Sequence, residues 1–301
     1  PILRRINQEH RVFSTGDFEH YVENFHYPNR SRFFLDQQTP PTHLVLHWTA
    51  NPHYYNPLFT LSAFLRRSYK GRLSERPNQY KNVSNYFLTG SLTDQEGQSQ
   101  AYLVKLTRGD LSTWGDIPRV TAYPTGNDWD DNKYDGRGAI GIEIDSPNFG
   151  VFYHNKQQKE KLMAFIQLVL TERGVISEFD AFRQSPHWDD MVKLHKFLQE
   201  HLPDFDVNSR GGIDQSYLYL DRILQYLPDI NPATYAEAQK MFKYISGHGI
   251  VAREYNTRMV QSGRHRDARY DKIDFTEPHV FVIAMDFLQS ERSTPPPVIV
   301  Q

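Results

Sequence analysis

Two short apolar segments, each carrying ionisable side chains, limit the folds open to this chain. Residues 42–50 (Thr-His-Leu-Val-Leu-His-Trp-Thr-Ala) follow a Pro-Pro pair, and residues 139–145 (Ala-Ile-Gly-Ile-Glu-Ile-Asp) alternate isoleucine with small or acidic residues. Segments of this length and composition predict buried β-strands. Because strands and helical patterns are mixed along the whole length, we predict an α/β domain with a central mixed β-sheet and flanking helices.

Helical spacing dominates the second half of the chain. Gln157–Arg173 has a single apolar stripe that is followed by a glycine, the usual end of a helix. We interpret residues 175–235 as a helical insertion within a domain of residues 41–290. Residues 1–40 are interpreted as an irregular arm packed on that domain, and the proline-rich residues 291–301 as a tail. Further helices are expected at Met191–Leu202, Ser216–Leu227, Ala233–Tyr244 and Pro278–Leu288.

The charge balance and the absence of cysteine exclude several classes of function. There are 34 Lys and Arg residues against 36 Asp and Glu, so the chain has no overall basic surface for nucleic acid. It has no Cys and 13 His, which excludes thiol nucleophiles and Cys-type zinc sites and leaves His, Asp and Glu as metal ligands. No apolar run approaches the roughly 20 residues of a membrane span.

The two predicted strands present His47 and Glu143. His47 lies at the carboxyl end of its strand, where α/β proteins build their sites. Strand alternation places Glu143 on a small, acidic face, with isoleucines on the opposite, core face. A carboxylate in an apolar strand is costly unless it is paired, exposed or functional. A core histidine and an edge carboxylate are the ordinary structural alternatives.

Two further motifs follow near the end of the chain. His248 lies between glycines in Ser-Gly-His-Gly, and Lys272 and Asp274 would point to the same side of an extended segment. An anionic ligand beside a cationic donor would serve both metal binding and oxyanion stabilisation. A turn histidine and a solvated charge run are the structural alternatives.

Taken in order, these motifs resemble a known family. The order is Leu-Val-Leu-His47-Trp-Thr-Ala, Asn85-Tyr-Phe-Leu, a Tyr-Pro-Thr-Gly that starts at Tyr123, Ile-Gly-Ile-Glu143-Ile, Gly-His248-Gly and Lys272-Ile-Asp274. It is similar to the order in zinc N-acetylmuramoyl-L-alanine amidases, the superfamily of type-2 amidases and peptidoglycan recognition proteins. The resemblance covers roughly residues 40–150 and 236–290.

The resemblance implies a Zn²⁺ site made of His47, His248 and Asp274, with Glu143 as general base and Lys272 as oxyanion donor. It implies hydrolysis of the amide between N-acetylmuramic acid and L-alanine in peptidoglycan or its fragments. Aromatic and polar side chains of the cleft would contact this substrate. We expect those contacts from Trp48, Asn85 and Tyr123.

Some features differ from the family pattern and keep alternatives open. The family often has His-Tyr where this chain has Asn85-Tyr, and Trp-His-Ala-Gly where it has the motif of Tyr123, so the preference for muropeptides is open. The 26 residues from His248 to Asp274 exceed the usual gap in the family. Other residues of that loop are alternative third ligands: His265, Asp267 and Asp271.

Three rival functions remain beside the amidase. The chain could be a non-catalytic peptidoglycan-binding module, a metallohydrolase of another class, or an amidase-type antibacterial effector. A partner protein could then dock on the arm or on the helical insertion. The resemblance implies a location in the cell envelope (periplasmic) or secretion, and leaves the cytoplasm open.

Overall fold

The computed structural model of this chain describes a core of segments around one sheet. The described residues are 39–49, 86–93, 99–101, 103–105, 137–203, 218–250, 253 and 274–290. Residues 1–38 of the predicted arm and the whole predicted tail lie outside them.

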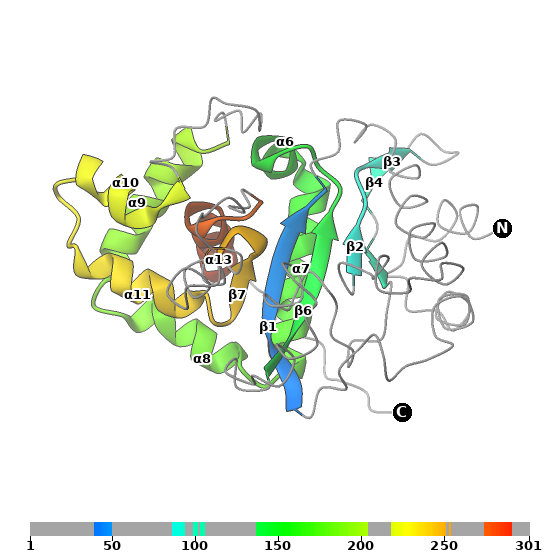
Figure 1. The fold of residues 1–301 in the computed structure, drawn as a ribbon, viewed down its shortest axis with the longest axis horizontal. Helices are drawn as coiled ribbons and strands as arrows, with labels where there is room; N and C mark the ends of the chain where they lie inside the picture. Colours follow the sequence, from blue (N-terminus) through cyan, green and yellow to red (C-terminus); the bar gives the residue numbers. More distant parts are fainter. Residues whose placement is uncertain are drawn as a thin grey trace, which may run out of the picture.

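The strands are short except for the two that the apolar segments predict. They are β1 (Thr39–Trp48), β2 (Tyr86–Leu88), β3 (Leu92–Thr93), β4 (Ser99–Gln100), β5 (Leu103–Lys105), β6 (Arg137–Ile144) and β7 (Ile245–Gly247). Both long strands lie at the centre of a five-stranded sheet with the order β5-β2-β6-β1-β7, shown in Figure 1. β3 and β4 form a separate antiparallel pair.

Four neighbouring strands of the main sheet run parallel. β6 pairs in parallel with β1 on one side and with β2 on the other, and β7 pairs in parallel with β1. β5 runs antiparallel to β2 at the edge, so the sheet contains both directions. Parallel pairing requires long crossover connections, and helices supply the one that is described, from β6 to β7. The prediction of an α/β fold with flanking helices is confirmed.

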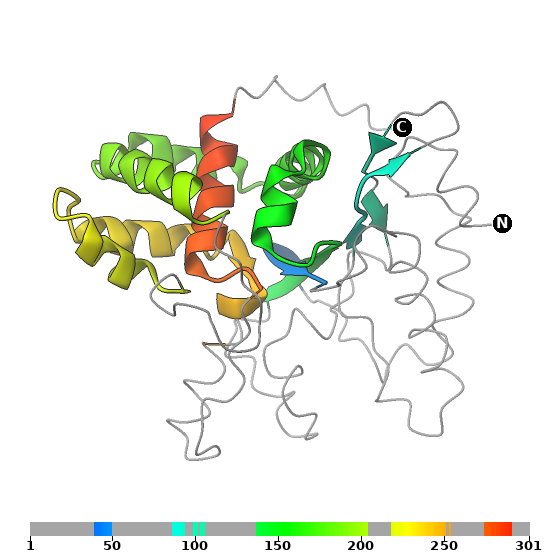
Figure 2. The same cartoon turned by 90° about the horizontal axis from the view of Figure 1, so that it is seen from above.

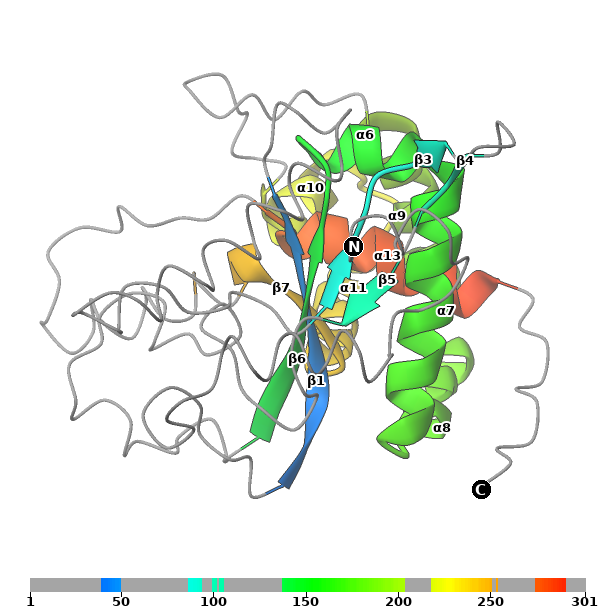
Figure 3. The same ribbon diagram turned by 90° about the vertical axis from the view of Figure 1, so that its right-hand side faces the viewer.

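The described helices all follow β6: α6 to α11 lead to β7, and α13 comes after β7. They are α6 (Phe149–His154), α7 (Lys156–Glu172), α8 (Ile176–Asp180), α9 (Trp188–His201), α10 (Leu220–Ile223), α11 (Ala233–Met241) and α13 (Glu277–Gln289), with 3₁₀ turns η3 (Ala181–Gln184) and η5 (Leu224–Tyr226). α7 and α13 lie on the same face of the sheet (Figure 3). α8 to α11 gather around α13 on the β7 side (Figure 2). The region predicted as a helical insertion is therefore helical where it is described.

Strand alternation divides the central strands as predicted. Ile142 and Ile144 of β6 are fully buried in the core, together with Leu46 of β1 and the apolar stripe of α7. Tyr86 contacts Phe165 of α7, with ring centroids 4.6 Å apart, which places even-numbered residues of this part of the sheet on the helix-covered face. Odd-numbered residues of β1 and β6 therefore point to the other face.

The acidic face of β6 is more enclosed than the alternation pattern suggests. Glu143 is 7% exposed and Asp145 is 1% exposed, because β6 is an inner strand with a neighbour on each side. Among the described residues, no helix combines the length and the apolar character that a membrane span needs.

Candidate metal centre

The central strands of the sheet bring His47 and Glu143 together, and His248 follows the neighbouring strand β7. His47 of β1 lies directly opposite Glu143 of β6 in the parallel pair. On the other side of β1, Leu46 is opposite Gly247, the last residue of β7, and His248 follows directly after it. Neighbouring strands are about 4.8 Å apart, and register partners share a face. Two adjacent strands and the residue that follows β7 thus bring two imidazoles and a carboxylate close together.

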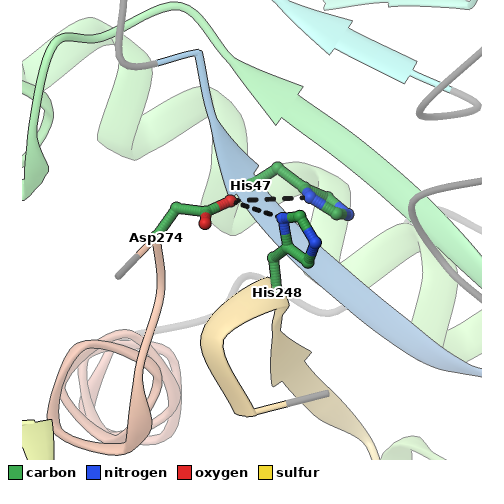
Figure 4. A group of neighbouring side chains, drawn as sticks. All are labelled: His47, His248 and Asp274. Atoms are coloured by element: carbon green, nitrogen blue, oxygen red, sulfur yellow. Dashed lines mark hydrogen bonds and ion pairs between the residues drawn. The ribbon is translucent and has the colours of Figure 1, made fainter. Parts of the chain in front are cut away.

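Asp274 completes the group from the segment that leads into α13. Its Oδ2 lies 2.9 Å from Nδ1 of His248 and 3.7 Å from Nδ1 of His47. The two imidazole rings are tilted, with centroids 4.5 Å apart. Figure 4 shows the three side chains converging, with one Asp274 oxygen facing a ring nitrogen of each histidine. The structure therefore brings together the three residues that were predicted as ligands.

The surroundings of Asp274 keep its side chain ionised. Burial alone would raise the pKa of this carboxyl, but the rings of His248 and His47 lower it, and the result is a pKa well below the usual range. A buried, ionised carboxylate beside two imidazoles is a strong oxygen ligand. Nδ1 of His248 is the nitrogen that faces Asp274, and Nε2 is buried with no hydrogen-bond partner among the described residues.

The separations suit a tetrahedral ion. Zinc binds imidazole nitrogen and carboxylate oxygen at about 2.0–2.2 Å, so tetrahedral geometry sets its ligand atoms about 3.4 Å from one another. The two Nδ1–Oδ2 separations, 2.9 and 3.7 Å, lie on either side of that value. The three ligand atoms all lie within 4.8 Å of one another. This buried His–His–Asp group could therefore hold a metal ion.

A tight turn holds Asp274 in place. Phe275 is fully buried, has a φ of +52°, and is the only non-glycine residue with a positive φ in the described part of the chain. That left-handed conformation costs a bulky residue energy, and such strain persists only where packing fixes the side chain. The packing comes from Trp48 and Phe149, whose rings lie 5.0 and 6.1 Å from that of Phe275.

Backbone contacts tie the two ligand-bearing segments together. The N–H of Gly249 donates to the carbonyl oxygen of Asp274 at 2.8 Å. Gly247 lies so close to Phe275 that a Cβ on the glycine would come within 1.8 Å of the Phe275 carbonyl oxygen. The glycine that precedes His248 is therefore explained by the close approach of the Asp274 turn.

Trp48 has a packing role instead of the expected cleft role. It is 4% exposed and lies on the opposite face of β1 from His47. Its ring contacts those of Phe275 and His279, with centroids 5.0 and 5.1 Å apart. A side chain enclosed in the aromatic core beneath the ligand turn supports Asp274 and does not face substrate.

Several predicted site residues fall on segments that the structure does not describe. These are Lys272, Asn85 and Tyr123, together with the alternative third ligands His265, Asp267 and Asp271. Their predicted roles stay predictions.

Sequence reasoning missed the residues that support the group. His279 accepts the backbone N–H of Thr276 on its Nδ1 at 3.1 Å, and so caps α13 just after the Asp274 turn. A Thr three residues before a polar side chain is the capping-box pattern, which could have indicated this start of the helix. No local signal indicates the left-handed Phe275, since its conformation depends on packing against distant parts of the chain.

Comparisons with protein-family models, with curated proteins and with solved structures find nothing that matches this chain. A function is therefore inferred from the geometry of the site and from the order of its motifs.

Proposed function

We propose that this chain is a zinc-dependent amidase that cleaves the bond between the lactyl group of N-acetylmuramic acid and L-alanine, in peptidoglycan or its fragments. The observation that carries the proposal is the convergence of His47, His248 and Asp274, with Glu143 beside His47 in the same row. The type-2 amidase-like fold and the substrate class come from the resemblance in motif order.

Zinc is the metal that this donor set favours. Two imidazoles and one carboxylate are the protein ligands of catalytic zinc sites, which keep a fourth position open. The lack of Cys removes the thiolate donors that iron–sulfur chemistry needs. When bound, zinc supplies Lewis acidity, which makes water nucleophilic near neutral pH and polarises a carbonyl group.

Glu143 is placed to accept the proton of the attacking water. Its Cα is the register partner of the Cα of His47, and its side chain shares the face of the two imidazoles. A general base must lie within hydrogen-bond reach of the proton that it removes. Lys272, two residues before Asp274, is proposed to donate to the oxyanion as the amide carbonyl becomes tetrahedral.

The ligand group favours an enzyme over a peptidoglycan-binding module. A protein that only binds the wall has no need of two imidazoles, an ionised carboxylate and a second buried carboxylate in one place. Burying these groups costs free energy that a binding surface would avoid. Zinc content of the purified protein separates the two functions, because the binding module need not retain the metal.

The experiment that tests the activity uses zinc-loaded protein and purified muropeptides. We expect mass analysis to show release of the peptide with L-alanine at its new amino terminus, and no release after chelation. Intact lactyl–alanine bonds under zinc-replete conditions would contradict the proposal.

Replacing Glu143 with Gln separates catalysis from metal binding. We expect Glu143→Gln to bind zinc normally and to lose about 10²- to 10⁴-fold in turnover, the usual contribution of a general base. Glu160→Gln, on an exposed part of α7, is the matched control and should keep full activity. Zinc content and kcat are measured on the same preparations, and normal kcat in Glu143→Gln would remove it from the base role.

A further inference from the structure

A pocket lies next to the proposed metal centre and takes no part in metal binding. It is a shallow pocket whose cavity volume is about 20 Å³, or about 280 Å³ when the adjoining open solvent is included. Its lining combines apolar, aromatic and charged side chains: Leu218, Tyr219, Ile250, Arg253, Thr276 and Glu277, with the backbone of Gly249.

The wall of this pocket is the same backbone that carries the ligands. Gly249 directly follows His248, and its N–H donates to the carbonyl of Asp274. Thr276 lies two residues after Asp274. Since consecutive Cα atoms are about 3.8 Å apart, the pocket begins within a few ångströms of two ligands. A substrate held at the metal centre would have this pocket as a neighbour.

Arg253 is held in a fixed orientation at the pocket. Its Nη1 donates to Oε1 of Glu277 at 2.9 Å, and its guanidinium carbon lies 4.0 Å from the ring centroid of Tyr219. The side chain is still 41% exposed. A guanidinium has five N–H donors, so a single ion pair leaves donors for another planar acceptor.

Glu277 is the buried partner of Arg253 and has further hydrogen bonds of its own. The Glu277 side chain is 9% exposed and also accepts from the Tyr235 hydroxyl and the Leu220 N–H, each at 3.4 Å. These contacts use both carboxylate oxygens on the inner side of the pocket. The buried acid and the aromatic face therefore restrain Arg253 before any ligand arrives, which lowers the entropy cost of binding.

We propose that this pocket is a substrate subsite in which Arg253 binds a free carboxylate of the peptide that follows the scissile amide. This inference rests on the proposed amidase function and specifies which end of the substrate is recognised. The guanidinium fork matches a carboxylate in a bidentate arrangement, which an ammonium group cannot reproduce. Tyr219 and Leu218, from the segment that begins α10, place part of the helical insertion against the substrate peptide.

Direct binding tests the subsite without turnover. The probes are L-alanyl-D-glutamate, which models the product side, and its diamide, which lacks both carboxylates. We expect calorimetry on zinc-loaded protein to show tighter binding of the free acid by about tenfold or more, as charge-assisted hydrogen bonds provide. Arg253→Gln should remove this preference, and Arg253→Lys should retain only part of it.

Arg222 provides the matched control. It also lies over the ring of Tyr219, with its guanidinium carbon 5.0 Å from the centroid, but it does not line the pocket. Arg222→Ala should keep the full preference for the free acid. Equal binding of the two probes by the unmodified protein, or a preference that survives in Arg253→Gln, would overturn the subsite.

The two proposals fail in different measurements. If the protein prefers the free acid through Arg253 but leaves the lactyl–alanine bond intact, the proposed subsite stands and the proposed amidase function fails. If the protein cleaves the bond but binds both probes equally, the proposed amidase function stands and the proposed subsite fails.

Discussion

Gly247 is the residue at which the two ligand-bearing segments come closest. An added Cβ would lie 1.8 Å from the carbonyl oxygen and 2.5 Å from the Cβ of Phe275. Neither group can yield easily, because one is backbone and the other is anchored in the aromatic core. Since Gly247 precedes His248 and Phe275 follows Asp274, any shift that relieves the clash moves one ligand away from the other.

We therefore predict that Gly247→Ala weakens zinc binding by about tenfold or more, the cost seen when supports of a metal ligand are changed. Competition with a chromophoric chelator measures this affinity. Gly174→Ala is the control, because Gly174 has a φ of +69° but open space around its Cβ position. That variant should lose about 1 kcal/mol of stability and keep its zinc affinity. Equal affinities in both variants would show that the close approach is not needed.

At the scale of elements, the sequence predicts structure wherever a pattern is local and long. The apolar runs predict β1 and β6 to within a few residues, and the stripe of Gln157–Arg173 predicts α7 at Lys156–Glu172. The helix expected at Ser216–Leu227 is instead the short α10, followed by a 3₁₀ turn. Its start is set by a distant contact, because the N–H of Leu220 donates to Glu277. Such contacts leave no local signal.

The start of α13 gives a pH-dependent prediction. Burial lowers the pKa of His279 from 6.5 to about 3, so the folded chain keeps this ring neutral while the unfolded chain protonates it below 6.5. Stability is therefore complete above pH 6.5 and falls toward pH 3, by about 1.4 kcal/mol per pH unit from this group. His279→Gln can keep the capping interaction without the titration. Urea unfolding at pH values between 7 and 4 measures the free energy of unfolding. This free energy should fall less steeply with pH in the variant than in the unmodified protein, and an equal fall in both would contradict this account.

At the scale of the whole molecule, the site depends on strand order. His47, Glu143 and His248 are about 100 residues apart in sequence, and only the arrangement β6-β1-β7 makes them neighbours. Periodicity predicts each strand separately but contains no information on which strands pair. The resemblance in motif order supplied that information for the three ligands. It could not supply the Phe275 turn or the core position of Trp48, which follow from packing between segments.

A site assembled from distant segments should couple metal binding to global stability. A metal that binds only the folded chain stabilises it by about 2.7 kcal/mol when its free concentration is 100 times Kd. We predict that zinc raises the midpoint of thermal unfolding by several degrees and that Asp274→Asn removes most of this rise, because an amide is a weaker ligand than the ionised carboxylate. His201→Gln changes a histidine at the end of α9, outside the ligand group, and should respond to zinc like the unmodified protein. An equal rise in Asp274→Asn would show that the zinc does not depend on Asp274, and would contradict the proposed ligand set.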